Sequence, residues 1–212
     1  MGTMTRERDR GATEQRLIAA VGLLLSKEGF ESLGVNSVAR EADVDKVLIY
    51  RYFDGMAGLL GAFGRSEAFW PSVEEVIGVG SADLRELPLA DRWAAGLSRY
   101  ARALRHRTVT REILAWEQVE KNELTEILRE IREEWFIGLL DALPEDPTQT
   151  DADLVSSVLF IVAGIHYLIA RSRRHSDFSG MVIDTDEGWD RIDGIILTIC
   201  RRTFREPDPH AG

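Results

Sequence analysis

Apolar residues recur three and four positions apart along nearly the whole chain, and alternation of apolar with polar residues never lasts beyond a few positions. A spacing of three and four puts apolar side chains on one face of an α-helix, whereas a half-buried strand needs a period of two. The first such segment covers residues 13–28 and stops at Gly29. The sequence therefore predicts an all-α fold of about nine helices.

The second half of the chain contains six longer segments with helical spacing, and proline and glycine mark their ends. Pro71 should end or kink the first, Pro144 and Pro147 separate the fourth from the fifth, and Ser179-Gly180 lies in the last loop. The predicted helices cover residues 56–70, 87–105, 109–120, 122–143, 151–174 and 187–205.

Two short helical segments, 34–41 and 45–53, follow the first helix and are separated only by Ala42-Asp43-Val44. Asp43 occupies a turn position where a left-handed backbone is often needed, and Asp tolerates that conformation better than most residues. Asp45 is placed to cap the third helix with its carboxylate. Three helices with this short turn predict a helix-turn-helix, the minimal unit that reads DNA.

At these residues the chain resembles the TetR family of transcriptional regulators. The resemblance lies in Gly29-Phe30, in the segment VAREADV at 38–44, in LIYRYF at 48–53, and in Leu59-Leu60. It covers about 50 residues, and the remainder matches only in helix count, length and placement. The resemblance implies a symmetric dimer that places two recognition helices in successive major grooves of a palindromic operator.

The chain departs from the family pattern at several positions that bear on DNA binding. Gly34 stands where Thr is usual, Asp43 where Gly is usual, Asp45 where Ser or Thr is usual, Leu48 where a small or polar residue is usual, and Met56 where Lys is usual. The missing lysine removes a typical phosphate contact, and phosphate repels the two extra carboxylates. A modest affinity or an unusual operator is expected.

Candidate DNA contacts follow from the family positions. Cationic side chains can bind phosphate or a guanine edge, tyrosine hydroxyls suit phosphate, and a valine can touch a thymine methyl group. Taken alone, Lys46 and Arg51 fit solvated surface charges better than DNA contacts, and the ordered motif around them reverses this preference. Phe53 is expected in the core. The candidate contacts are Asn36, Lys46, Val47, Tyr50, Arg51 and Tyr52.

Charge and spacing suggest three parts: a flexible basic arm at 1–12, a helix-turn-helix domain at 13–54, and a larger helical domain at 55–212. The resemblance implies that this larger domain binds a ligand and forms the dimer. Residues 1–53 hold eight basic and eight acidic side chains, so the net charge of −10 comes wholly from residues 54–212. The arm carries Arg6, Arg8 and Arg10, which could follow the minor groove.

Aromatic residues at helical spacing in the second half are expected mainly to fill the hydrophobic core. The resemblance, however, implies an effector cavity among them. Apolar walls with a few polar tips suit a small hydrophobic or aromatic effector. Glu117 and Glu120 leave a cationic ligand open, although a solvated helix face is the preferred interpretation of both residues. The candidate ligand contacts are Trp93, Tyr100, Trp116, Phe136, Phe160, His166 and Tyr167.

Residues 154–170 form an uncharged segment whose length is short for a membrane span. No membrane partner is therefore expected. The resemblance implies instead a homodimer built from helices 151–174 and 187–205. Ala163 and Gly164 would let helices approach closely there.

Other function classes find little support in the sequence. Cys200 is the only cysteine, and the four histidines have no metal-ligand spacing, so no cofactor and no metal are expected. The polar N-terminus is no secretory signal, which favours a cytoplasmic protein. The first alternative is a helical interaction protein that has lost DNA binding. The second is a helical small-molecule enzyme, which has less support because the chain has no phosphate-binding glycine loop and no nucleophile motif.

Overall fold

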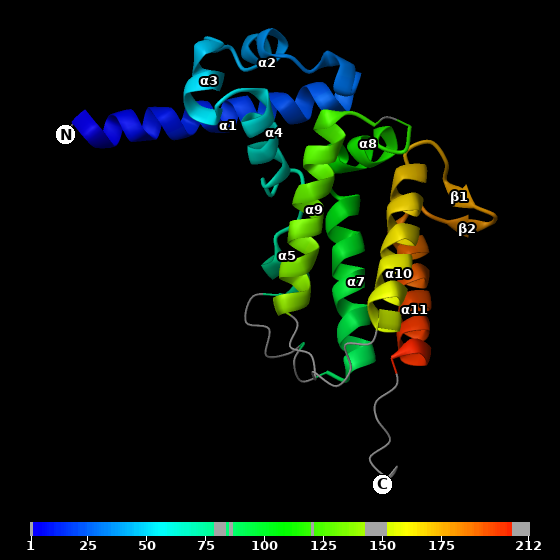
Figure 1. Cartoon of the computed structure of the whole chain (residues 1–212). Helices are drawn as coiled ribbons and strands as arrows, with labels where there is room; N and C mark the ends of the chain where they lie inside the picture. The colour runs from blue at the N-terminus through cyan, green and yellow to red at the C-terminus, as the bar shows by residue number, and fades with distance from the viewer. Residues whose placement is uncertain (1, 79–83, 85–86, 120, 143–151, 205–212) are drawn as a thin grey trace. The chain divides into compact units, whose positions relative to one another are not determined.

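A computed structural model describes residues 2–78, 84, 87–119, 121–142 and 152–204 (Figure 1). This described part contains ten α-helices, one 3-10 helix and one two-stranded hairpin. The predicted all-α fold is therefore confirmed. Contacts divide the chain into two compact units: Met1–Trp70 with Arg107–Trp135, and Pro71–His106 with Phe136–Gly212. The domain division at residues 54 and 55 stays a prediction.

Unit 1 is built around α1 (Gly2–Glu28), which packs against α2 (Val35–Glu41), α4 (Met56–Gly64) and α8 (Thr108–Trp116). The 3-10 helix η1 (Phe30–Ser32) follows α1, and α3 (Val47–Phe53) packs against α4. The unit also holds the first part of α9 (Glu123–Ala142). Its fully buried side chains include Leu17, Leu25, Ile49, Leu59, Leu60, Ile113 and Leu128.

The first helix begins at Gly2, well before the predicted start at residue 13. The segment of the expected arm is helical, and Arg10 pairs with Glu14 one turn away at 2.7 Å. Such pairs stabilise a helix, and no proline interrupts the segment. The side chains of Arg6 and Arg8 lie outside the described residues.

The fourth helix ends at Gly64, so the prediction of one helix over 56–70 is wrong beyond that residue. Gly64 packs closely on α9, where an added Cβ would lie 2.6 Å from Ile131 Cδ1. Three glycines in nine residues weaken the helix, and the Ser66 hydroxyl donates to the Phe63 carbonyl just after its end. After Pro71 comes a separate helix, α5 (Val73–Ile77). Ser72 caps its start, because its hydroxyl accepts a hydrogen bond from the Glu75 amide.

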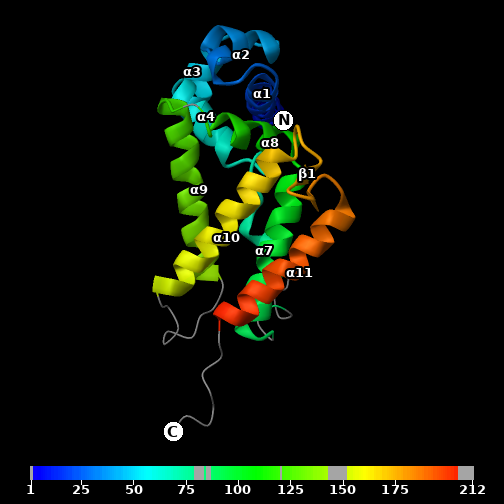
Figure 2. The same cartoon turned by 90° about the vertical axis from the view of Figure 1, so that its right-hand side faces the viewer.

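Unit 2 is organised around α7 (Leu89–Arg105), which packs against α5, α10 (Ala152–Arg171) and α11 (Asp186–Thr203). Figure 2 shows α10 and α11 lying alongside α7. The long helices lie close to their predicted ranges, and α8 ends earlier, at Trp116. Pro144, Pro147 and Glu120 lie outside the described residues. The core includes Trp93, Leu97, Leu104, Val158, Ile165, Ile169, Ile192 and Ile196.

A hairpin joins α10 to α11, which the sequence predicted only as a loop. Strands β1 (Asp177–Phe178) and β2 (Met181–Val182) pair antiparallel. Ser179 and Gly180 between them have φ of 52° and 85°. Two successive positive φ values suit a two-residue hairpin turn. Strands of two residues are too short to produce a detectable alternation, so the expectation of no strand was wrong here.

Across the described residues, the length and apolarity needed to cross a membrane do not coincide in any one helix.

Candidate nucleic-acid interface

The turn between α2 and α3 has the geometry that the sequence predicted. Asp43 has φ 51°, in the left-handed region, which confirms the expected conformation. The Val44 amide donates to the Ala39 carbonyl at 3.0 Å. Asp45 Oδ1 accepts from the Val47 amide at 2.9 Å, which confirms the cap, although α3 begins two residues later than predicted.

The start of α2 is organised by Ser37, a residue that sequence reasoning missed. Its hydroxyl donates to the Ser32 carbonyl at 2.7 Å and accepts from the Gly34 amide at 2.9 Å. Gly34 has no side chain to cap the helix, and it stands where the TetR family usually has Thr. Ser37 therefore fixes the loop before α2 from inside the helix.

The third helix is buried on one face and exposed on the other. Ile49 is the buried residue of α3 and is fully buried. On α2, Val38 is fully buried and Ala39 is nearly so. Asp54 and Gly55, with φ of 58° and 105°, end the helix. This arrangement leaves the opposite face of α3 free to meet a partner.

The structure places the candidate DNA contacts mainly on that exposed face. Val47 and Tyr50 are 60% and 58% exposed, although both could have packed in a core. Lys46 and Arg51 are exposed beside them, and Asn36 is exposed on α2. The exposed side chains combine two cations, a phenol hydroxyl, an amide and a valine, which are the groups that contact phosphates and base edges.

Tyr52 differs from the other candidates because it is half-buried against α1. The Arg10 guanidinium lies over its ring, 5.1 Å from the centroid, and Arg10 Nε lies 2.7 Å from Glu14 Oε1. The hydrogen bond that Arg10 donates to the Glu14 carboxylate holds the pKa of Arg10 above its usual range. Arg10 thus has one partner on α1 and one on α3.

Arg16 contacts the turn itself, and sequence reasoning missed it. Its Nη2 donates to the carbonyls of Ala42 and Asp43 at 2.5 and 2.7 Å. The same nitrogen lies 3.6 Å from Asp43 Oδ2. Because the main acceptors are backbone carbonyls, no pairing of residue types in the sequence signals this contact.

In unit 2, the structure brings together two of the expected ligand contacts. The Tyr100 hydroxyl lies 2.5 Å from His166 Nε2, and Tyr100 is buried. Trp93 is buried with its ring 6.4 Å from that of Phe204. These placements do not test a ligand role, which stays a prediction.

The other expected ligand contacts are dispersed. Phe160 and Tyr167 are exposed on α10, and Phe136 is half-buried on α9. Trp116 lies in unit 1 against Gly29, where an added Cβ would be 3.1 Å from Trp116 Cε2.

A pocket of about 280 Å³ opens between α7 and α11 in unit 2, with a charged lining that contains none of the seven candidates. Arg105 Nη2 lies 2.7 Å from Asp186 Oδ1, and the Arg105 guanidinium lies 4.8 Å from the centre of the Trp189 ring. Arg105 holds the pKa of the Asp186 carboxyl below its usual range. This ion pair connects α7 to α11 at the pocket.

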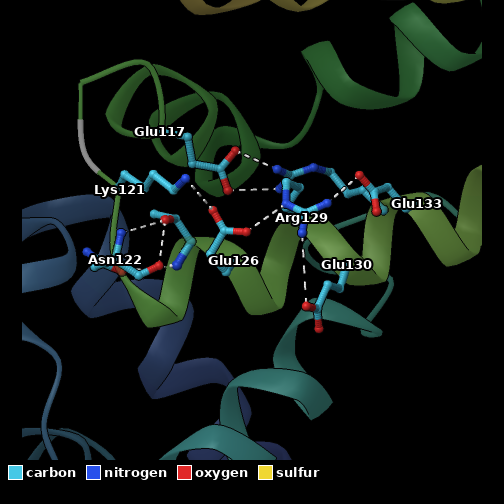
Figure 3. A network of polar contacts seen from close by, with 9 residues as sticks. Glu117, Lys121, Asn122, Glu126, Arg129, Glu130 and Glu133 are labelled. Carbon is cyan, nitrogen blue, oxygen red and sulfur yellow. Dashed lines mark hydrogen bonds and ion pairs between the residues drawn. The ribbon is translucent and has the colours of Figure 1, made fainter.

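Figure 3 shows a network of ion pairs on α8 and α9 in unit 1. Arg129 contacts Glu126 at 2.8 Å and also pairs with Glu133, and all three side chains are well exposed. Glu117 pairs with Arg132 and is only 11% exposed. The interpretation of Glu117 as part of a solvated helix face is therefore wrong: its carboxylate is engaged within the protein.

An apolar strip lies uncovered on α10 and α11. Phe160 is 82% exposed, and the small residues Ala163 and Gly164 lie exposed on the same helix. An added Cβ at Gly164 would meet nothing within 4 Å. We refer to the following residues as the α10/α11 strip: Leu159, Phe160, Tyr167, Ile195 and Ile199.

Comparison with known proteins supports the same fold. Residues 17–63 match the model of the bacterial regulatory proteins of the tetR family. The chain has no significant match among proteins of curated function. The fatty acid degradation regulator FadR from Bacillus halodurans is 15% identical and has a TM-score of 0.62, with 90% of this chain and 99% of that chain covered.

Two further solved structures are similar. FadR from Bacillus subtilis, in complex with stearoyl-CoA, is 15% identical over 90% of this chain and 99% of its own, with a TM-score of 0.59. A TetR family transcription regulator from Marinobacter aquaeolei VT8 is 17% identical over 92% and 97%, with a TM-score of 0.57. The resemblance is thereby confirmed: residues 17–63 form a TetR-family helix-turn-helix domain, and the chain has the all-α fold of TetR-family transcriptional regulators.

Proposed function

We propose that the chain is a cytoplasmic, ligand-responsive transcriptional repressor that binds palindromic operator DNA as a homodimer. The observation that carries this proposal is the asymmetry of α3. Ile49 anchors the helix in the core, while Arg51 and Val47 point away from it and Lys46 and Tyr50 are exposed between them. A helix held in this way can enter the major groove with its exposed side chains toward the bases.

The exposed groups suit distinct parts of DNA. Arg51 can donate two hydrogen bonds to a guanine edge or bind a phosphate, and Lys46 can do either as a point charge. Tyr50 suits a phosphate oxygen, and Asn36 near the start of α2 suits another. Val47, at 60% exposure, is placed for apolar contact with a thymine methyl group.

Dimerisation is proposed through the α10/α11 strip. A phenylalanine that is 82% exposed beside four other exposed apolar side chains is costly to leave in water. The open space at Gly164 allows a second helix to approach closely. A two-fold axis through this strip would bury the same residues of both copies.

Effector binding is proposed in unit 2, with the hydrogen-bonded pair of Tyr100 and His166 as polar contacts among apolar neighbours. FadR from Bacillus subtilis, which shares the fold, was solved with stearoyl-CoA, a ligand with a long apolar chain. We therefore favour a hydrophobic or aromatic effector that releases DNA by changing the spacing of the two recognition helices. A coupling of about 1–3 kcal/mol would change DNA affinity roughly 5- to 150-fold.

Gel-retardation titration with the DNA that flanks its own gene tests the DNA-binding proposal. The wild-type protein is expected to give sequence-selective retardation that weakens with salt, and Arg51→Ala should abolish it. Lys27→Ala is the matched control because Lys27 is an exposed cation at the far end of α1. Absence of retardation at low salt would overturn the proposal.

A thermal-shift titration with stearoyl-CoA tests the effector proposal. A bound probe raises the Tm, and Tyr100→Phe is expected to reduce that rise because it removes the hydroxyl near His166. An unchanged Tm would exclude long acyl chains from the effector class. A rise of equal size in the variant would exclude Tyr100 from the site.

The second candidate function is a helical interaction protein without DNA binding. Asp43 and Asp45 add exposed carboxylates beside α3, and Met56 stands where a phosphate-binding lysine is usual. Retention of the dimer together with a lack of retardation on any DNA would favour this alternative.

A further inference from the structure

Arg16 lies at the joint between two differently supported helices. Helix α2 packs against α1, whereas α3 packs against α4. Residues 42–46 link α2 to α3, so the direction of α3 depends on the shape of this segment, which begins with the turn Ala42-Asp43-Val44. Arg16 reaches that turn from α1.

The contact of Arg16 satisfies backbone carbonyls of the turn that follows α2. A seven-residue helix has little stability of its own, so the turn after it gains from support by another helix. Nη2 of Arg16 donates to the carbonyls of Ala42 and Asp43, at 2.5 and 2.7 Å. Its positive charge also complements the negative end of the helix dipole.

Asp43 makes this support more important. It adopts a left-handed backbone, φ 51°, without being glycine, a conformation that is unfavourable for most L-residues. Its carboxylate lies 3.6 Å from Arg16, but both side chains are well exposed, and exposed ion pairs contribute little. The two hydrogen bonds to backbone carbonyls therefore dominate the interaction.

We propose that Arg16 is a positioning residue for DNA recognition, which locks the turn so that α3 presents Lys46 and Arg51 in one fixed direction. The inference rests on the proposed function, because positioning matters only if α3 meets DNA. Arg16 acts through the turn and does not itself contact the operator.

Hydrogen exchange of the free protein tests the lock without DNA. Arg16→Met keeps most of the aliphatic stem and removes the donors. Amides of residues 43–49 are expected to exchange about tenfold faster in this variant, the effect of losing a charged hydrogen bond. Lys27→Ala removes the same charge from the same helix and should leave these rates unchanged. Equal rates in Arg16→Met and wild type would overturn the proposal.

DNA affinity as a function of salt tests positioning directly. Arg16→Met is expected to bind the operator about tenfold more weakly, with the same dependence of log affinity on log salt as wild type. Arg16→Lys, which keeps a cationic donor of similar length, should recover most of the affinity. A decrease of the salt slope by about one would show that Arg16 itself neutralises a phosphate, and that result contradicts the proposal.

A second variant and the exchange measurement separate a failure to fold and a lack of DNA binding from a failure of the lock. Arg16→Gln replaces Arg16→Met if the latter does not fold, and the same effects are expected at smaller size because an amide donor remains. If wild type binds no DNA while exchange at 43–49 still rises in the variant, the proposed function fails and the lock itself stands.

Discussion

Arg132 holds Glu117 through two hydrogen bonds, with Nη1 and Nη2 lying 2.9 and 2.8 Å from its two carboxylate oxygens. The two side chains are 17% and 11% exposed, and the ring of Trp70 lies 5.4 Å from the guanidinium. Burial raises the pKa of the Glu117 carboxyl, and Arg132 opposes part of that effect. The pair joins α8 to α9 inside unit 1.

Arg132→Met is expected to lower the free energy of unfolding by about 2–4 kcal/mol at about pH 7, because it leaves a buried carboxylate without its partner. Without Arg132 the pKa of Glu117 rises further in the folded protein. A raised folded pKa favours the folded state below the ordinary pKa of the carboxyl, and this contribution is lost as pH rises. Urea titrations should therefore show a smaller loss at about pH 4.

The control for this prediction is Arg129→Met, which breaks ion pairs with Glu126 and Glu133 on the exposed face of α9. Exposed pairs contribute less than about 1 kcal/mol each, so a small loss is expected. Equal losses for Arg132→Met at both pH values, or equal losses in the two variants at about pH 7, would contradict the account of a buried pair.

Cys200 should be inert toward thiol reagents in the folded protein. The side chain is fully buried on α11, and burial, with the nearby charge of Asp91, raises its pKa to about 12. At about pH 8 only roughly one thiol in ten thousand is ionised, and the thiolate is the reactive form. Ellman's reagent should react quickly in concentrated urea and very slowly without it. Equal rates under both conditions would contradict this burial.

Phe160→Asp is expected to convert the proposed dimer to a folded monomer. The substitution removes the most exposed apolar side chain of the α10/α11 strip and places a charge there twice, once in each copy. A side chain of this size contributes about 1.5–3 kcal/mol when buried, so the dissociation constant should rise by at least a hundredfold. Sedimentation equilibrium measures this change, with circular dichroism to confirm the fold.

The matched control is Ile137→Asp, because Ile137 is an apolar residue on α9, 59% exposed and outside the strip. This variant should dimerise as wild type does. A dimer that tolerates Phe160→Asp, or that is lost equally in Ile137→Asp, would place the interface elsewhere.

The fold was largely predictable because helical spacing of apolar residues reflects a buried face directly. Leu17, Val21 and Leu25 share one face of α1 and are all fully buried. The turn at Asp43 and the cap at Asp45 were also predictable, since both depend on the local backbone and one side chain. The same reasoning misplaced the end of α4, because apolar spacing continues past Gly64 to Trp70 while the glycines and Ser66 weaken the helix there.

The candidate site was predictable only in part. The exposed part of α3 follows from the family positions, because Lys46, Tyr50 and Arg51 are all exposed while Ile49 is fully buried. Arg16 and Ser37 were missed because they act on backbone carbonyls and amides, which are the same for every residue type. Burial of Glu117 was missed because its partner lies on another helix and no local pattern signals it.

Two copies of α3 are expected to meet two successive turns of DNA. Hydroxyl-radical footprinting of the wild-type protein on an operator selected from random sequence shows where each copy binds. Two protected half-sites related by a two-fold axis are expected, with centres roughly 34 Å or about 10 base pairs apart, and Arg51→Ala should lose both. A single protected patch, or protection that Arg51→Ala retains, would contradict the account.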